Sequence, residues 1–283
     1  MMLVNLKEIL KYAEDNKCAV GMFNATGFDS LQAIIKAAEK LNQPVILAHA
    51  EVHNVYNDIS LVAPVMLSLA KNSKVPVCVH LDHGTTLEMI KRAINLGFTS
   101  IMIDASSLPF EENIKFTKQV VDMCHPKNIS VEGEIGQLIT SENGTSNKLK
   151  SKEYYYTKPN EAKEFVEKTS VDALAIAFGT AHGFYKEKPL LDVNVIKNVK
   201  KLVNVPLVMH GGSGLSKEQF QDCIKAGIRK INYYSYMSKA GYEAAKKLIE
   251  SNKTSYLHDV EFEAMKAMEK NVEEAIKIFS MKD

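Results

Sequence analysis

Three of the eight histidines of this sequence stand at the ends of short apolar runs, at His83, His182 and His210. Carboxylates end two neighbouring runs, at Asp104 and Glu134. A lone histidine in such a place is commonly a structural hydrogen-bonding group, whereas three imidazoles with an open fourth position are typical of a catalytic zinc site. The pattern therefore favours a metal site. Within it, Asp104 and Glu134 are alternate ligands, hydrogen-bonding partners of the ligands, or ion-pair partners inside the fold.

Asp82 directly precedes His83, so the two side chains diverge from one strand end. Asp82 can then face a substrate while His83 faces the metal, which suits an acid or base working beside a Lewis acid. The alternative is that Asp82 only orients a histidine. His80 shares a face with Asp82, and Glu132 shares one with Glu134; we expect both to be structural. The remaining histidines are expected to be surface or core residues: His49, His53, His125 and His258.

A glycine-rich segment, Gly211-Gly212-Ser213-Gly214, follows His210 and leads into a predicted helix. Backbone N–H groups in such a loop can approach an anion, and the helix dipole favours negative charge there. After the next apolar run, Asn232-Tyr233-Tyr234-Ser235 offers an amide and a hydroxyl. A Gly-Ser segment is often a plain turn, but its place beside a candidate metal ligand predicts a phosphate site.

Eight apolar runs alternate with segments of helical periodicity, which predicts parallel strands joined by crossover helices. Eight such units close a TIM (β/α)8 barrel, an α/β fold that typically has about 250 residues. An open doubly wound sheet is the alternative. Polar residues at the run ends, Asn24 among them, favour the barrel, whose chemistry lies at the carboxyl ends of its strands. The runs are 19–24, 44–50, 75–82, 100–104, 129–135, 173–178, 205–210 and 231–234; helices are expected at 30–41, 160–168, 217–226, 239–250 and 261–279.

Composition excludes several classes of protein. The chain has 35 Lys and Arg against 34 Asp and Glu, a net charge of +1, so it lacks the basic footprint of nucleic-acid binding. No apolar run approaches the roughly 20 residues of a membrane span. The four cysteines lie far apart and the N-terminus does not resemble a signal peptide. We therefore expect a cytoplasmic protein with one domain over residues 1–283.

Residues 136–157 show no periodicity and are rich in Ser, Asn and Lys. Structureless segments of this length are uncommon in compact domains and often form lids or binding loops. We predict a lid here; disorder without a role is the alternative.

Five motifs resemble those of the class II, metal-dependent ketose-bisphosphate aldolases, in the tagatose- and fructose-bisphosphate branch. They are HLDHG (80–84), MIDAS (102–106), VEGEIG (131–136), GTAHGFYK (179–186) and HGGSG (210–214). The resemblance runs in consistent order from about Asn5 to Asn232 and weakens beyond.

The resemblance implies a zinc-dependent TIM barrel that reversibly cleaves a ketose (bis)phosphate, such as fructose or tagatose 1,6-bisphosphate, to dihydroxyacetone phosphate and an aldehyde. Asp82 would donate a proton to the C4 oxygen in the aldol step, and Glu142 in the predicted lid would move the C3 proton. Zinc would be bound by His83, His182 and His210, with Asp104 and Glu134 at a second or displaced metal position. A monovalent cation is a further cofactor, and a homodimer or homotetramer is expected. The substrate contacts would be Gly183, Lys186, Gly211, Gly212, Ser213, Asn232, Tyr233, Tyr234 and Ser235, and Asn24 is a further candidate for substrate binding.

Three regions depart from the family pattern. Ala50 stands where the family usually has a phosphate-binding Ser, and Tyr233 and Tyr234 replace small or acidic residues. The Asp-Pro-Arg segment that helps to hold the distal phosphate is missing near the C-terminus, and a lost guanidinium fork is not a neutral change. We therefore hypothesise a different aldehyde half, as in a ketose 1-phosphate or a modified sugar phosphate.

Three other functions are alternatives. A zinc hydrolase on the same barrel would not depend on Glu142. A non-catalytic sugar-phosphate sensor would tolerate Asp82→Asn. A Schiff-base aldolase is disfavoured because none of the predicted strands has a lysine in its interior or carboxyl half.

Overall fold

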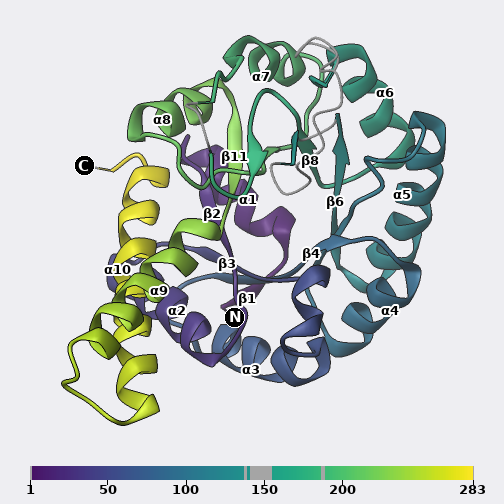
Figure 1. The fold of residues 1–283 in the computed structure, drawn as a ribbon. Helices are drawn as coiled ribbons and strands as arrows, with labels where there is room; N and C mark the ends of the chain where they lie inside the picture. Colours follow the sequence, from purple (N-terminus) through teal and green to yellow (C-terminus); the bar gives the residue numbers. More distant parts are fainter. Residues whose placement is uncertain (1, 137–138, 141–154, 186–188, 283) are drawn as a thin grey trace.

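Eight parallel strands close into a barrel in the computed structural model, which describes residues 2–136, 139–140, 155–185 and 189–282 (Figure 1). Around the barrel the order is β4-β3-β2-β11-β10-β8-β6-β5, and a further pairing of β4 with β5 closes it. The predicted TIM barrel and its alternation of strands and helices are confirmed. The barrel strands are β2 (Val20–Asn24), β3 (Val45–Ala50), β4 (Val77–Gly84), β5 (Ser100–Ile103), β6 (Ser130–Ile135), β8 (Ala173–Ile176), β10 (Leu207–Met209) and β11 (Ile228–Tyr233).

Helices surround the barrel on its outside, and none in the described part of the chain is long and apolar enough to cross a membrane (Figure 1). Several begin at side-chain caps, such as Thr86, whose hydroxyl accepts the Met89 N–H. The helices are α1 (Leu6–Asp15), α2 (Phe28–Leu41), α3 (Ile59–Asn72), α4 (Leu87–Leu96), α5 (Phe110–Cys124), α6 (Pro159–Thr169), α7 (Val193–Lys200), α8 (Lys217–Ala226), α9 (Ser235–Glu250) and α10 (Leu257–Phe279), with the 3-10 turns η1 (Glu51–Val55) and η2 (His125–Lys127).

The apolar core has two parts. The larger lies between the outer faces of the strands and the helices. The smaller fills the amino-terminal half of the barrel interior, where Leu6, Ile9 and Leu10 of α1 pack against inward-facing residues such as Ile46 and Val208. Because α1 closes this end, the open end of the barrel is the carboxyl end of the strands.

Three short strands fall outside the predicted set. β1 (Leu3–Val4) pairs with β4, and β7 (Ile139–Thr140) pairs in parallel with β9 (Ala181–His182). Runs of two residues carry too little periodicity to be recognised in a sequence.

One prediction about the strands is wrong. β11 begins at Ile228 rather than at residue 231, so it contains Arg229 and Lys230. Lys230 is wholly buried inside the barrel, so the statement that no strand has an interior lysine does not hold. The two basic residues break the apolar run in the sequence, whereas in the fold the charge of Lys230 is compensated by Glu132.

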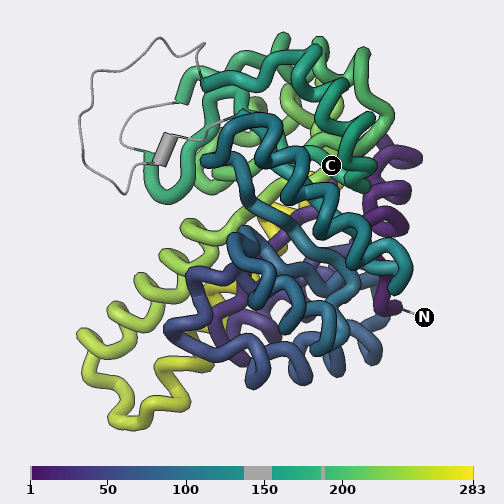
Figure 2. The backbone as a smooth tube through the Cα atoms, turned by 90° about the vertical axis from the view of Figure 1, so that its right-hand side faces the viewer, coloured from purple at the N-terminus to yellow at the C-terminus, as the bar shows by residue number. Residues whose placement is uncertain are grey.

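α9 and α10 form a helical pair that projects from the barrel, and the carboxyl end of α10 returns to it (Figure 2). α10 begins at Leu257, four residues before the predicted start at residue 261. Phe279 at its end is 1% exposed and packs against the rings of Phe23, Phe220 and Tyr233. Its carbonyl accepts the N–H of Ala19 at 2.9 Å, just before β2. The end of α10 therefore supports the outside of β2 and β11.

Phe279→Ala is expected to lower the free energy of unfolding by about 3–5 kcal/mol, because it leaves a cavity among three aromatic rings. Phe262→Ala is the matched control on the same helix, since this ring is 57% exposed. It should change stability by no more than about 0.5 kcal/mol. Denaturant unfolding monitored by circular dichroism measures both, and equal losses would contradict this account of the core.

Candidate active site

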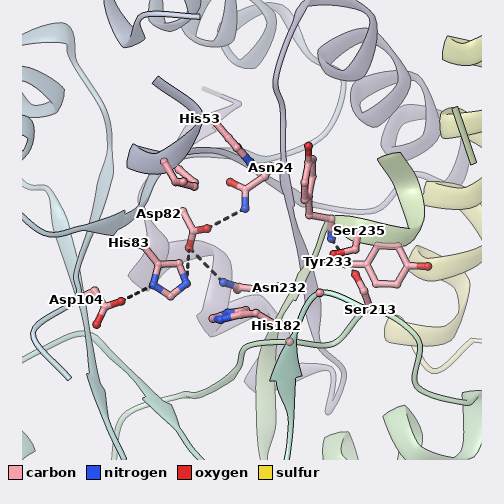
Figure 3. Close-up of a pocket in the computed structure, with 15 residues that line it drawn as sticks. Asn24, His53, Asp82, His83, Asp104, His182, Ser213, Asn232, Tyr233 and Ser235 are labelled. Carbon is pink, nitrogen blue, oxygen red and sulfur yellow. Dashed lines mark hydrogen bonds and ion pairs between the residues drawn. The ribbon is translucent and has the colours of Figure 1, made fainter. Parts of the chain in front are cut away.

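A cavity of about 380 Å³ opens at the carboxyl ends of the strands (Figure 3). Most of the predicted site residues line it, although they come from six strands and the loops that follow them. The lining residues are Asn24, Ala50, Val52, His53, Asp82, His83, Asp104, His182, Gly183, Gly211, Ser213, Asn232, Tyr233, Tyr234 and Ser235.

Five predicted site residues stand apart from this lining. His210 and Glu134 are buried just behind it, within reach of the other candidate ligands. The N–H of Gly212 donates to the Asn232 carbonyl at 3.2 Å, which joins the loops after β10 and β11. Glu142 and Lys186 lie outside the described residues, as does most of the predicted lid.

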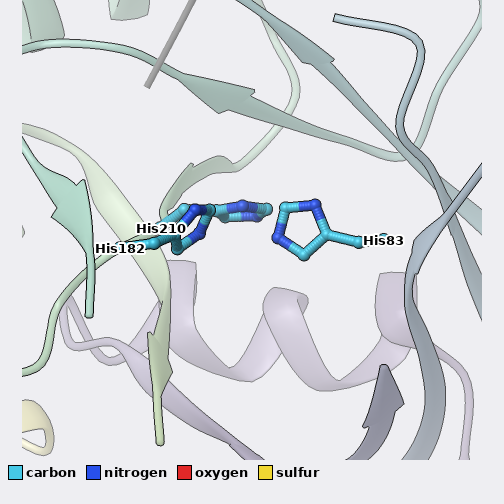
Figure 4. Close-up of side chains that lie close together, drawn as sticks. All are labelled: His83, His182 and His210. Carbon is cyan, nitrogen blue, oxygen red and sulfur yellow. The ribbon is translucent and has the colours of Figure 1, made fainter. Parts of the chain in front are cut away.

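The imidazoles of His83, His182 and His210 face one another (Figure 4). The ring centroid of His83 lies 5.0 Å from that of His182 and 4.8 Å from that of His210. One nitrogen from each ring falls in a group whose atoms all lie within 4.8 Å of one another. His83, Asp104 and Glu134 form a second group that meets the same limit. The two groups share His83, as expected for one metal site with an adjoining second position.

For two of these rings, those of His83 and His210, a hydrogen bond to a carboxylate sets which nitrogen is left to bind a cation. His83 Nδ1 is bonded to Asp104 Oδ2 at 2.7 Å, which leaves Nε2 toward the cluster. His210 Nε2 is bonded to Glu132 Oε1 at 2.9 Å, which leaves Nδ1. Such carboxylate–histidine pairs orient metal ligands and fix their tautomers.

The donor set fits a divalent cation. His210 Nδ1 and Glu134 Oε2 are buried 3.4 Å apart, and neither has a hydrogen-bond partner among the residues that the structure describes. Buried polar atoms without partners are costly. A cation between the imidazoles and the carboxylate would satisfy both atoms.

The charges of the cluster act strongly on one another. Burial opposes the charged form of His83, but the carboxylates of Asp82 and Asp104 outweigh it and raise the pKa to about 10. Burial, together with His83 and His210, lowers the pKa of His182 to about 3. Burial, with the charge of Asp104, raises the pKa of Glu134 to about 7.

The backbone is distorted where β4 delivers its two site residues. The pairing of β4 with β5 shifts register between Leu81 and Gly84, and His83 has a φ of 46°. Non-glycine residues rarely adopt this left-handed region, and bulges commonly re-aim side chains at functional sites. The bulge turns His83 toward Asp104 while Asp82 keeps its inward direction (Figure 3).

Asp82 is held by two amides. Asn24 Nδ2 donates to Asp82 Oδ2 at 2.8 Å, and Asn232 Nδ2 donates to Asp82 Oδ1 at 3.2 Å (Figure 3). Burial would raise its pKa, but His83, His210 and Lys230 outweigh this and hold the pKa of Asp82 below its usual range. Asp82 is therefore an oriented, ionised carboxylate at the edge of the metal-type cluster.

The predicted phosphate loops are tied together by one tyrosine. The Tyr185 hydroxyl accepts the Ala181 N–H at 3.0 Å and donates to the Gly211 carbonyl at 2.7 Å. Gly211 has a φ of 65°, and a side chain there would collide with the Ala181 carbonyl. Ser213 Oγ accepts the N–H of Tyr234 at 3.1 Å. The loops after β8, β10 and β11 therefore form one connected wall of the cavity.

Sequence reasoning missed His53, which lines the cavity from η1. Its ring centroid lies 4.8 Å from that of Tyr234, just after β11. Burial lowers its pKa, so it is neutral at neutral pH. The sequence signal for His53 is its position three residues after the end of β3, because the active sites of such barrels lie in the loops that follow the strands.

A (β/α)8 barrel with a histidine cluster of this kind at its carboxyl end is the architecture of metal-dependent barrel enzymes. The chain matches the family model "Fructose-bisphosphate aldolase class-II" over residues 4–283 and belongs to this family. It is therefore an aldolase, an enzyme that cleaves a carbon–carbon bond.

Solved structures agree with this assignment. The YdjI aldolase from Escherichia coli K12 shares 36% sequence identity, with a TM-score of 0.88 and coverage of 98% of this chain and 97% of that one. A candidate fructose-1,6-bisphosphate aldolase from Coccidioides immitis shares 30% identity, with a TM-score of 0.85 and coverage of 97% and 96%. The fold also matches fructose-bisphosphate aldolase from Campylobacter jejuni, at 22% identity and a TM-score of 0.79 over 97% and 93% of the two chains.

Zinc binding by the metal-free protein at pH 8 is expected to release about one proton. His83, with a pKa of about 10, is protonated at that pH, and only the neutral imidazole can ligate a metal. Affinity should therefore rise as the pH increases toward 10. Calorimetry in buffers of different ionisation enthalpy measures the release. His83→Asn should abolish the proton release, and His125→Asn, on the surface, should not. Zinc binding without proton release by the unmodified protein would contradict the charge state assigned to His83.

Proposed function

We propose that this aldolase is zinc-dependent and reversibly cleaves a ketose phosphate to dihydroxyacetone phosphate and an aldehyde. The observation that carries the proposal is the pairing of three mutually facing histidines with an ionised, amide-held Asp82 at one cavity, which His83, His182 and Asp82 line and which His210 lies just behind. A passive sensor would not need a carboxylate that is both buried and fixed by two amides, and a zinc hydrolase would not depend on Glu142.

His83, His182 and His210 would hold the zinc ion, with Asp104 and Glu134 offering a second divalent position. A metal held there supplies a Lewis acid for the ketone oxygen and for the negative charge that develops as the C3–C4 bond breaks. Imidazole ligands suit zinc among the common divalent ions. We also retain a monovalent cation as a proposed cofactor.

Asp82 would act as the general base and general acid at the C4 oxygen. In cleavage the ionised carboxylate takes the C4 hydroxyl proton, and in the aldol direction it returns that proton to the C4 oxygen. Asn24 and Asn232 fix its two oxygens, so its direction is set before the substrate arrives. We propose Glu142 as the base for the C3 proton of dihydroxyacetone phosphate.

The phosphate end of the substrate would lie against the wall that Tyr185 joins together. Gly183, Gly211, Ser213 and Ser235 line the cavity there, with backbone and hydroxyl groups near the start of α9. Anions are stabilised at such sites by N–H groups and helix dipoles. We propose Lys186, Gly212 and Tyr233 as further contributors.

The aldehyde end would lie toward Ala50, His53 and Tyr234, which line the cavity together. None of these side chains carries a fixed positive charge to match a second phosphate. This supports a ketose 1-phosphate or a modified sugar phosphate over a bisphosphate. Comparison of kcat/KM across both kinds of substrate tests it, and a preference for fructose or tagatose bisphosphate over every monophosphate would refute it.

We further propose a single-domain cytoplasmic protein, consistent with the match over residues 4–283. A homodimer or homotetramer is proposed for its assembly, which light scattering after size exclusion would measure.

The metal-loaded protein should exchange the C3 proton of dihydroxyacetone phosphate for deuterium in heavy water. The reaction needs the metal, the phosphate wall and the base, but no aldehyde. NMR follows the loss of the proton signal, and EDTA should abolish it. Glu142→Gln should slow it by about 10²–10⁴-fold, whereas Glu161→Gln on the surface should not. No exchange by folded, metal-loaded protein would favour a sensor.

Asp82→Asn should lower kcat for cleavage by about 10²–10⁴-fold while leaving proton exchange within a few-fold of the unmodified rate. The reason is that exchange involves the C3 proton and cleavage also requires transfer at the C4 oxygen. Asp122→Asn, at an exposed carboxylate of α5, is the control. Equal losses in both reactions would place Asp82 in metal binding or folding instead.

A further inference from the structure

A lysine inside the barrel is left unexplained by the proposed chemistry. Lys230 on β11 is 0% exposed. Its Nζ lies 2.9 Å from Glu132 Oε2, 3.2 Å from Glu132 Oε1 and 2.8 Å from Asn232 Oδ1. An ammonium group has only N–H donors; this one donates hydrogen bonds to Glu132 Oε1 and Asn232 Oδ1 and forms a close ion pair with Glu132 Oε2. Burying a charge is costly unless it is paired and hydrogen-bonded, as this ammonium group is. We therefore ask what the lysine contributes to the site.

One side of Lys230 leads to a proposed metal ligand. Glu132 is also fully buried, and its Oε1 accepts both Lys230 Nζ and His210 Nε2. The carboxylate thus lies between the ammonium group and the imidazole. Holding Nε2 as a donor leaves Nδ1 of His210 with its lone pair toward the cluster.

The other side leads to Asp82. Lys230 donates to Asn232 Oδ1, so the oxygen of this amide faces the lysine and its nitrogen faces Asp82, to which it donates at 3.2 Å (Figure 3). An asparagine side-chain amide can flip and exchange its oxygen and nitrogen. Because the Lys230 ammonium group only donates hydrogen bonds, the amide oxygen must face it. The same ammonium group therefore sets the orientation of the amide that holds Asp82.

We infer that Lys230 is a positioning residue that holds His210, through Glu132, and Asp82, through Asn232, in a fixed relation to each other. This inference rests on the roles proposed above for His210 and Asp82. Lys230 does not itself line the cavity in the described part of the chain. Its contacts assign it to orientation rather than to a covalent intermediate with the substrate.

Lys230→Met keeps an unbranched side chain, one atom shorter than lysine, and removes its charge and donors. The Glu132 carboxylate then loses its counter-charge and is free to turn from His210, and Asn232 loses the partner of its oxygen. Zinc affinity should fall by about 10–100-fold, as for other groups that orient metal ligands. At saturating zinc, kcat for cleavage should fall by a larger factor than the rate of proton exchange, because only cleavage uses Asp82. Lys200→Met, at a half-buried lysine that pairs with Glu14 at 2.6 Å, should change neither quantity.

A double-variant cycle separates positioning from general stability. If Lys230 acts on the metal through Glu132, the Lys230→Met/Glu132→Gln protein should bind zinc no more weakly than Glu132→Gln alone. The double variant also removes both charges of the pair, so it avoids an uncompensated charge if Lys230→Met alone does not fold. Losses of zinc affinity that simply add would overturn the inference.

The unmodified protein gives a readout that is independent of activity. Long-range ¹H–¹⁵N NMR of histidine-labelled, metal-free protein should show His210 protonated at Nε2, with the signal assigned by its loss in His210→Asn. Protonation at Nδ1 would overturn the first arm of the inference.

Borohydride reduction in the presence of dihydroxyacetone phosphate should leave the mass of Lys230 unchanged; a reduced adduct on it would overturn the positioning role. If the unmodified protein fails to exchange protons, the proposed function fails. If it exchanges them and Lys230→Met retains unmodified zinc affinity and cleavage, the inference alone fails.

Discussion

The carboxylate of Glu132 is the group on which the arrangement of the site depends. It is fully buried, and residues from other strands compensate its charge: Lys230 on β11 and His210 just after β10. A buried charge that loses its partner costs several kcal/mol. The barrel must therefore close with these strands in their observed register, because a shift of one residue would turn the charged side chains to the opposite face. The strand register that closes the barrel is therefore also the register that brings the site residues together.

Polarity increases along the interior of the barrel toward its open end. The inward face of β4 carries Cys78, His80 and Asp82 in order, while that of β6 carries Ser130, Glu132 and Glu134. Below them lies the apolar layer closed by α1, which needs no polar partners. The apolar layer supplies burial energy and excludes water from beneath the charges. In that low-dielectric setting the carboxylates and imidazoles act on one another strongly, which accounts for the opposite directions in which the pKa values of His83 and His182 move.

Much of this could be predicted from the sequence, because the outward faces of strands are apolar and the residues at strand ends are polar. The eight apolar runs predicted the barrel, and their ends supplied the histidine cluster and Asp82. Lys230 was missed because Arg229 and Lys230 interrupt the apolar run, and only the fold shows that Glu132 compensates one of them. His53 was missed because a histidine in a loop is usually a surface residue. The bulge that contains His83 and the choice of ring nitrogen depend on contacts between distant strands, which no local pattern encodes.

The residues proposed for catalysis and those proposed to select the substrate lie in different structural settings. The charged network of Glu132, Lys230 and Asn232 is buried, so any replacement there leaves another charge or amide unpaired. The proposed phosphate wall relies on backbone groups and on Tyr185, which constrain the loops rather than the identity of many side chains. By contrast, Val52 and His53 lie on the short turn η1, and Tyr234 lies at the start of α9. Side chains there can change without exposing a buried charge. Substrate preference can therefore vary at this rim while the proposed metal ligands and Asp82 keep their positions.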